Sequence, residues 1–212
     1  MNVKLESPDI LLFSDYLSEI LLCIDMCTPL LEEDDSYNFR TRYPEVFEVF
    51  FRSLTTKIII NTASLFSDSD ITKKGGKKLD NLSLKNYWSK NQQKLSQKTR
   101  QIYSDIEAQL EVMNLAEYRN KLVAHKSKVE AILESPYSQH EGHSFNRSIS
   151  IDSLRQLALL GIDFFNSAFR DLACDLSGNK YPDSYNFIDY QNLSTPYSME
   201  DFLFEFKSST FI

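Results

Sequence analysis

Apolar side chains recur at steps of three and four residues along most of this chain, and that period is the strongest constraint on its fold. In the first such stretch the recurring residues are Ile10, Phe13, Leu17, Ile20, Leu21 and Ile24. A stripe with this spacing is the buried face of an α-helix. Only 5 Gly and 6 Pro occur in 212 residues, so few residues are suited to tight turns. The pattern therefore predicts long helices.

Start and stop signals divide the pattern into four long helices and one short helix. Ser7-Pro8-Asp9 predicts the start of the first helix, which should end before Pro29 because proline disrupts a helix interior. The acidic run at 32–35 is expected to be a solvated loop. The other expected helices run from Pro44 to Phe66, from Ser83 past Trp88, from Ser96 to Leu133 and from Ser150 to Gly178. No stretch shows a convincing strand pattern.

These elements predict an all-α fold, an antiparallel bundle of four to five helices. The bundle domain should span residues 1–178. A C-terminal extension, residues 179–212, is rich in Tyr, Phe, Ser and Asn and should be irregular apart from one short helix at 199–206. Cys23 and Cys27 lie one turn apart in the first helix, and we expect them to be buried apolar side chains because no histidine is nearby in sequence.

Charge and cysteine content narrow the classes of function. The formal net charge is -7, which argues against a general nucleic-acid coat protein. Three cysteines without a CxxC pair suit a reducing compartment. The first residues lack the layout of a signal peptide, and no apolar run is long enough to cross a bilayer. The sequence predicts a cytoplasmic protein with no membrane partner.

One segment departs from this acidic character. Between Lys73 and Arg100, nine Lys and Arg residues stand against the single acid Asp80, a balance of +8 that leaves -15 on the rest of the chain. Gly75-Gly76 marks a turn within the segment. Two interpretations stay open: a groove for RNA in which Trp88 stacks on a base, or a solvated helix face with Trp88 in the core. The candidate RNA-binding residues of this segment are Lys85, Lys90 and Lys94.

A second concentration of functional side chains is Tyr118-Arg119-Asn120-Lys121-Leu122-Val123-Ala124-His125, inside the third long helix. An α-helix turns by about 100° per residue, so Arg119 and His125 fall about 60° to either side of Leu122. If Leu122 faces the packed side, a guanidinium and an imidazole lie at the edges of that face. His125 also continues the apolar stripe and should be at least partly buried. Such a pair is suited to phosphate chemistry.

These residues resemble the motif of HEPN domains. In that family an arginine, usually followed by a polar residue, precedes a histidine by four to six intervening positions, and here Arg119-Asn120 precedes His125 with five between the arginine and the histidine. The order of the surrounding helices, from Tyr43 to Leu176, is similar to the abortive-infection U-type branch of the family. The resemblance leaves the first helix and the C-terminal extension unexplained.

The resemblance implies a metal-independent endoribonuclease without a cofactor, acting as a toxin or phage-defence effector. In such proteins a homodimer brings two Arg-His motifs together over one RNA cleft. His125 would be the general base or acid, Arg119 would hold the phosphate, and Asn120 would orient the imidazole or donate to the phosphate. Tyr118 and Lys121 would be neighbours on the RNA side. An antitoxin or another defence-system protein is an expected partner.

The alternative is a helical RNA-binding or protein-interaction module of the same fold without catalysis. Arg119 would then be a surface ion-pairing residue, with Glu107, Glu111 or Glu117 as its partner, and His125 a hydrogen-bonded core residue. About 120° separates Arg119 from His125 on an ideal helix, so one motif need not converge on one phosphate. A symmetric second copy would supply the missing group.

Overall fold

The structure is a computed structural model that describes residues 4–5, 9–31, 33–68, 71–74, 77–117, 119, 149–174, 178–189, 199, 201 and 203. The elements in chain order are β1 (Lys4–Leu5), α1 (Asp9–Leu31), α2 (Glu33–Arg42), α3 (Pro44–Phe66), β2 (Ile71–Lys74), β3 (Lys77–Asp80), α4 (Leu84–Asn91), α5 (Gln97–Met113), α7 (Ile151–Leu172) and β4 (Ala173–Cys174). Most described residues are helical, which confirms the all-α prediction.

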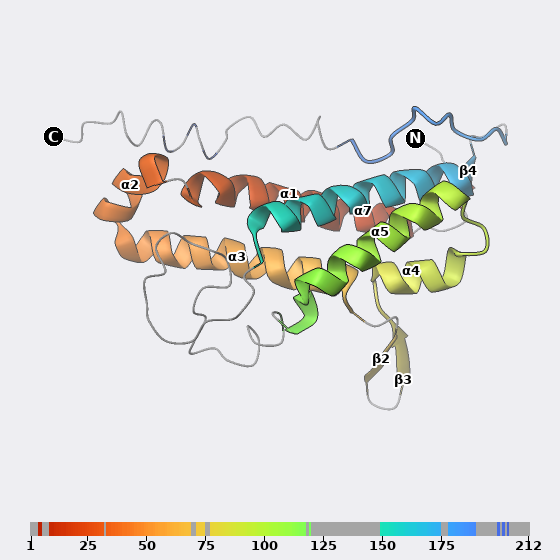
Figure 1. Ribbon diagram of the computed structural model, residues 1–212, viewed down its shortest axis with the longest axis horizontal. Coiled ribbons are helices and arrows are strands. Elements are labelled where there is room, and N and C mark those ends of the chain that lie inside the picture. Colours follow the sequence, from red (N-terminus) through yellow and green to blue (C-terminus); the bar gives the residue numbers. More distant parts are fainter. Residues whose placement is uncertain are drawn as a thin grey trace.

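The long helices lie side by side with alternating directions (Figure 1). Helix α1 packs against both α3 and α7, and α5 packs against the other side of α7. Helix α2 joins α1 to α3 at one end of the molecule. The short helix α4 and the β2–β3 hairpin follow α3 near the opposite end of that helix (Figure 1).

Most of the predicted helix starts are confirmed, because each is set by a local cap. Pro44 occupies the first turn of α3. Ser83, Ser96 and Ser150 precede α4, α5 and α7, and each hydroxyl accepts a hydrogen bond from the backbone N–H three residues later. A serine in this position satisfies one of the backbone donors that a helix start leaves without an intrahelical partner.

Two predictions for the end of the first helix and the residues after it were wrong. Pro29 lies inside α1, two residues before its end, and removes the one backbone hydrogen bond that its N–H would have donated. Burial of Cys27 and Leu30 on the same turn offsets that loss. The acidic run at 32–35 was predicted to be a loop. Its last three residues instead form the start of helix α2, which begins at Glu33. Acids near its start and Arg40 and Arg42 in its last turn complement the helix dipole.

The expectation that no strands occur was also wrong. Helix α7 ends at Leu172 rather than near Gly178, because Ala173 is extended and pairs in β4 with Leu5 of β1. Strands β2 and β3 form a second antiparallel pair. Gly75-Gly76, where a turn was predicted, lies between these strands in sequence and outside the described residues.

The core is centred on aromatic side chains of α7. Phe165 stacks on Phe13 of α1 with ring centroids 4.3 Å apart, and Tyr87 of α4 meets Phe13 edge-on at 5.6 Å. Gly161 of α7 lies against the Phe66 ring of α3 and Leu17 of α1, and a Cβ atom there would sit 2.7 Å from Cζ of Phe66 and 3.0 Å from Cδ2 of Leu17. A larger residue would therefore displace these side chains.

The C-terminal residues 181–189 pack along α7. The Asn166 side chain, itself buried, donates to the backbone oxygen of Ile188 at 3.0 Å and accepts from its N–H at 2.7 Å. Phe187 stacks on Phe169 with centroids 4.6 Å apart. The Asn166 side chain thus satisfies both backbone groups of Ile188, as a neighbouring strand would. The predicted domain boundary at 178 stays a prediction.

Cys23 and Cys27 are both buried, as expected. Burial raises the pKa of the Cys27 thiol to about 12, and it raises that of Cys23 as well. None of the helices in the described part of the chain combines the length and the apolar character that crossing a membrane demands.

Candidate functional site

The helix that should carry the Arg-His motif is interrupted before it reaches the motif. Helix α5 ends at Met113, and Asn114 adopts the left-handed conformation with φ 49°. Asparagine tolerates this conformation better than most residues. A new helical turn begins at Leu115, which is buried. The predicted continuous helix from Ser96 to Leu133 is therefore wrong at Asn114, where the chain changes direction.

Arg119 is the motif residue that the structure describes. Its guanidinium forms an ion pair with the carboxylate of Asp68, and the two side chains are 25% and 28% exposed. Asp68 lies two residues after Phe66, the last residue of α3, and its N–H donates to the Ala63 carbonyl. A cation is favoured at this end of a helix and an anion is not, so Arg119 compensates both the carboxylate and the helix dipole.

The structure pairs Arg119 with Asp68, which is not among the glutamates considered from sequence. Asp68 lies 51 positions away along the chain, so no local pattern identifies the pair. The ion pair brings the start of the predicted motif to the end of α3, immediately before the β2–β3 hairpin. Tyr118, Asn120, Lys121 and His125 lie outside the described residues, so their predicted roles stay predictions.

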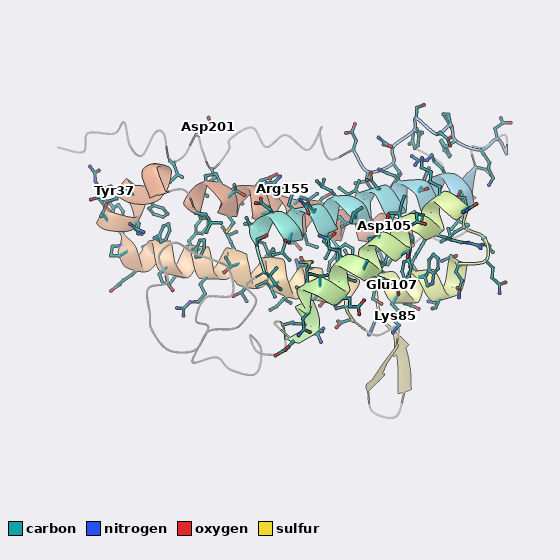
Figure 2. All side chains as sticks on the ribbon, in the orientation of Figure 1. Tyr37, Lys85, Asp105, Glu107, Arg155 and Asp201 are labelled. Carbon is teal, nitrogen blue, oxygen red and sulfur yellow. The ribbon has the colours of Figure 1, made fainter. Side chains whose placement is uncertain are left out.

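The described part of the basic segment provides exposed lysines and a partly buried tryptophan. Lys85 and Lys90 of α4 and Lys94, which follows that helix, are all exposed. Figure 2 shows Lys85 next to the base of the β2–β3 hairpin. The Trp88 ring stacks on Tyr103 of α5, with centroids 3.9 Å apart and planes at 5°. One face of the indole is thus covered by protein, which favours the core interpretation of Trp88 over base stacking.

Tyr103 is held firmly in this stack. Burial raises the pKa of its phenol, and the neighbouring carboxylate of Glu107 raises it further. The phenol therefore stays protonated at neutral pH and is unsuited to act as a general base. We assign Tyr103 to packing between α4 and α5.

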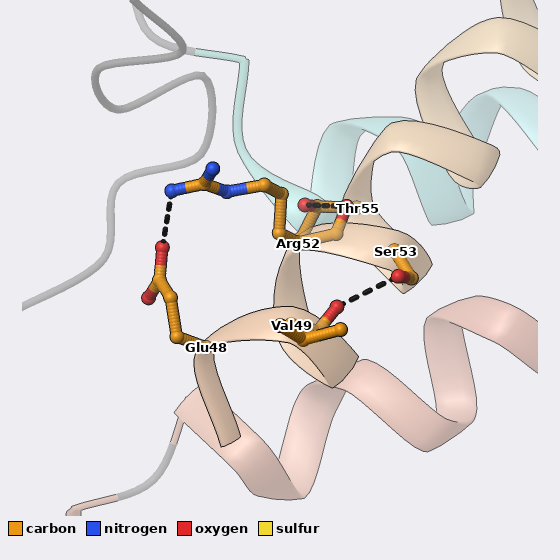
Figure 3. A network of polar contacts seen from close by, with 5 residues as sticks. All are labelled: Glu48, Val49, Arg52, Ser53 and Thr55. Carbon is orange, nitrogen blue, oxygen red and sulfur yellow. Dashed lines mark hydrogen bonds and ion pairs between the residues drawn. The ribbon is translucent and has the colours of Figure 1, made fainter. Parts of the chain in front are cut away.

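A hollow of ≈ 440 Å³ runs along the exposed side of α3, but its charged groups are already paired within the protein. Arg52 donates to Glu48 at 2.7 Å, one turn earlier on the same helix, and Ser53 donates to the Val49 carbonyl (Figure 3). Lys57, also on the hollow, pairs with Glu19 of α1. Intramolecular pairs of this kind favour a structural role for this surface.

No family model, curated protein or solved structure matches this chain. Residue chemistry and geometry therefore carry the functional argument. Within the described ranges, no three His, Cys, Asp or Glu side chains gather into a group that could hold a metal ion. The group there that best fits phosphate chemistry is the Arg119–Asp68 pair, flanked in sequence by the basic hairpin and α4.

Proposed function

We propose that this chain is a metal-independent endoribonuclease of the HEPN type, acting as a toxin or phage-defence effector. The observation that carries the proposal is the position of Arg119. Its side chain is 25% exposed, and its guanidinium pairs with a carboxylate just beyond the end of α3. A phosphate oxygen carries the same charge as that carboxylate and accepts the same forked hydrogen bonds. In this proposal an RNA phosphate takes the place of the Asp68 carboxylate beside Arg119.

The chemistry needs few protein groups. RNA carries its own nucleophile, the 2'-hydroxyl, which attacks the adjacent phosphorus when its proton is removed. His125 would remove that proton and return one to the departing 5'-oxygen, because an imidazole titrates near neutral pH. Arg119 would stabilise the charge that develops on the phosphate oxygens. Asn120 would orient the imidazole or donate to the phosphate, and Tyr118 and Lys121 would contact the RNA.

A homodimer completes this site in our proposal. Arg119 and His125 diverge by about 120° on an ideal helix, so the groups of two motifs together can surround one phosphate. Near the end of α5, seven positions before Arg119 in sequence, Val112 is 68% exposed. Single exposed apolar residues are common on protein surfaces, so Val112 is the point at which we propose to test the dimer contact.

A second candidate function is a non-catalytic RNA-binding or protein-interaction module of the same fold. The same ion pair favours it, because Arg119 already has a carboxylate partner without RNA. In this case Arg119 would tie the motif segment to α3 and contribute mainly to stability. The two candidates differ in what Arg119→Ala does: it abolishes cleavage in the first and lowers stability in the second.

A cleavage assay separates the candidates. The wild type, His125→Ala and Arg119→Ala are incubated with a mixed RNA pool that includes tRNA, in the presence of EDTA. We expect cleavage by the wild type and loss of cleavage in both variants, each with the circular dichroism spectrum of the wild type. Arg155→Ala is a matched control, because Arg155 forms a comparable ion pair with Asp25 away from the motif. A folded wild type that cleaves no RNA would contradict the nuclease proposal.

A further inference from the structure

An irregular segment, residues 178–189, runs back along the outer side of α7 (Figure 1). Of these twelve residues one is buried, three are half-buried and eight are exposed. The buried residue is Ile188, and the half-buried ones are Tyr181, Tyr185 and Phe187. The segment therefore lies on the surface of the bundle, and a few side chains attach it there.

Two side chains of α7 bind the main chain of this segment. Asn166 is 4% exposed, and its amide donates to the Ile188 carbonyl at 3.0 Å and accepts from the Ile188 N–H at 2.7 Å. Arg170, one turn further along α7, donates to the Tyr185 carbonyl at 2.8 Å. Every residue presents a backbone carbonyl, and every residue except proline a backbone N–H. These contacts therefore fix the path of a peptide without depending on its side chains.

Aromatic contacts add a preference for particular side chains. Phe169, which is fully buried on α7, meets the rings of Tyr181, Tyr185 and Phe187 with centroids 5.1, 5.7 and 4.6 Å away. Packed aromatic pairs attract beyond the burial of their area. Main-chain hydrogen bonds combined with side-chain contacts are how peptide-binding sites join affinity to specificity. We call Asn166, Phe169 and Arg170 the Asn166 site.

We propose that the Asn166 site binds residues 181–189 of a second copy of this chain. A second copy presents the same sequence, and the fit of that sequence to the site is visible in the structure. Exchange between two copies replaces each contact within a chain by the same contact between chains. Tyr185 is 11 positions after Cys174, the last residue of β4, and such a stretch spans roughly 36 Å when extended. Helix α7 has 22 residues and is about 33 Å long, so the segment can reach a molecule lying alongside.

Competition within one chain sets the conditions for exchange. A tethered segment competes for its own site at an effective concentration of about 1 mM. The site is occupied in the structure, and an occupancy of at least about 90% requires a Kd of about 100 µM or less for a segment from another chain. Exchange is favoured where two copies are already held together, because the partner's segment then has a comparable effective concentration.

The test mixes two full-length variants that each retain half of the contact. The segment variant carries Phe187→Ser and Ile188→Asp and retains its site, whereas the site variant carries Asn166→Ala and retains its segment. Both also carry Val112→Glu, so that the dimer proposed for the nuclease does not contribute. In sedimentation velocity each variant alone should be a monomer. The mixture should form a 1:1 complex with a Kd of about 100 µM or less.

Two controls make the result specific. A chain that combines the changes of both variants offers neither a site nor a segment, so it should form no complex with the site variant. A synthetic peptide of residues 179–189 should dissociate the complex of the two variants. Arg170→Gln provides a second site variant that leaves Asn166 in place. Each protein must give the circular dichroism spectrum of the wild type, and Arg170→Gln replaces Asn166→Ala if the latter does not.

A mixture that sediments as separate monomers at about 300 µM of each variant would overturn the proposal, because that concentration exceeds the required Kd. A complex that the peptide does not dissociate would assign the contact to another surface and would equally overturn it. Loss of the folded bundle in the segment variant would show that residues 181–189 are a fixed part of the core, with the same consequence. Failure of the nuclease proposal is a separate result, since the contact involves neither RNA nor Arg119.

Discussion

Neutralising Asp68 should strengthen RNA binding if Arg119 is a phosphate ligand. In the proposed mechanism an RNA phosphate and the Asp68 carboxylate compete for the Arg119 guanidinium. Asp68→Asn preserves the shape of the side chain and removes its charge. The variant should therefore bind RNA more tightly than the wild type.

The size of the effect follows from the exposure of the pair. An exposed ion pair contributes about 0.2–1 kcal/mol, and a fully buried one costs several times more to break. Side chains that are 25% and 28% exposed lie between these limits. We take about 1 kcal/mol for the displaced attraction, which corresponds to roughly a fivefold decrease in Kd.

A double-mutant cycle isolates this term from the general effect of removing an acid. Affinity for one labelled RNA is measured at fixed salt for His125→Ala alone and with Asp68→Asn, Arg119→Ala or both. The fivefold gain should disappear when Arg119 is alanine. Asp25→Asn, which releases Arg155 instead, should change affinity much less. An equal gain with and without Arg119, or no gain at all, would refute the reasoning.

Three further predictions concern packing and assembly. Asn166→Ala strands the buried N–H and carbonyl of Ile188, so urea unfolding should show a loss of about 2–4 kcal/mol, and a loss below about 0.5 kcal/mol would show that the contact is dispensable. The pKa of Cys27 is raised, so its contribution to stability is fully present below the ordinary thiol pKa of 9.0 and is lost as the pH rises toward about 12. Near pH 8 the Cys27 thiol should resist iodoacetamide until urea unfolds the chain, and rapid labelling of the folded protein would contradict its burial. Val112→Glu should shift the proposed dimer toward monomer in sedimentation, whereas Val49→Glu on α3, where the valine is similarly exposed, should not; an identical effect of both would exclude this part of α5 from the interface.

The parts of the fold that follow local chemistry were predictable from sequence. Serine caps and apolar stripes gave the positions of α3, α4 and the start of α5, because a cap acts over three residues and a stripe over a few turns. Asn114 was harder to interpret, since the residues around it continue a helical pattern and only its own φ interrupts the helix. At Pro29 the local preference predicted that the helix should end earlier. Burial of side chains at the end of α1 outweighed that preference, and the helix continues to Leu31.

Contacts between distant residues were not predictable. The pairing of Leu5 with Ala173 and the ion pair of Asp68 with Arg119 join parts of the chain that no sequence period connects. For the candidate site, sequence indicated Arg119 and the exposed lysines, but not the carboxylate that holds Arg119. The hairpin was missed because each strand has only 4 residues and two lysines, a residue that is depleted in strands, although Ile71 and Thr72 are β-branched. The predicted geometry between Arg119 and His125 remains a prediction.

The chemical identity of the RNA ends tests the central claim most directly. An end-labelled RNA is digested by the wild type in EDTA, and the products are examined before and after phosphatase treatment. Attack by the 2'-hydroxyl predicts a 2',3'-cyclic phosphate or 3'-phosphate on one fragment and a 5'-hydroxyl on the other, with both products absent for His125→Ala. Fragments with 5'-phosphate and 3'-hydroxyl ends, or the same products from His125→Ala, would contradict a nuclease built on Arg119 and His125.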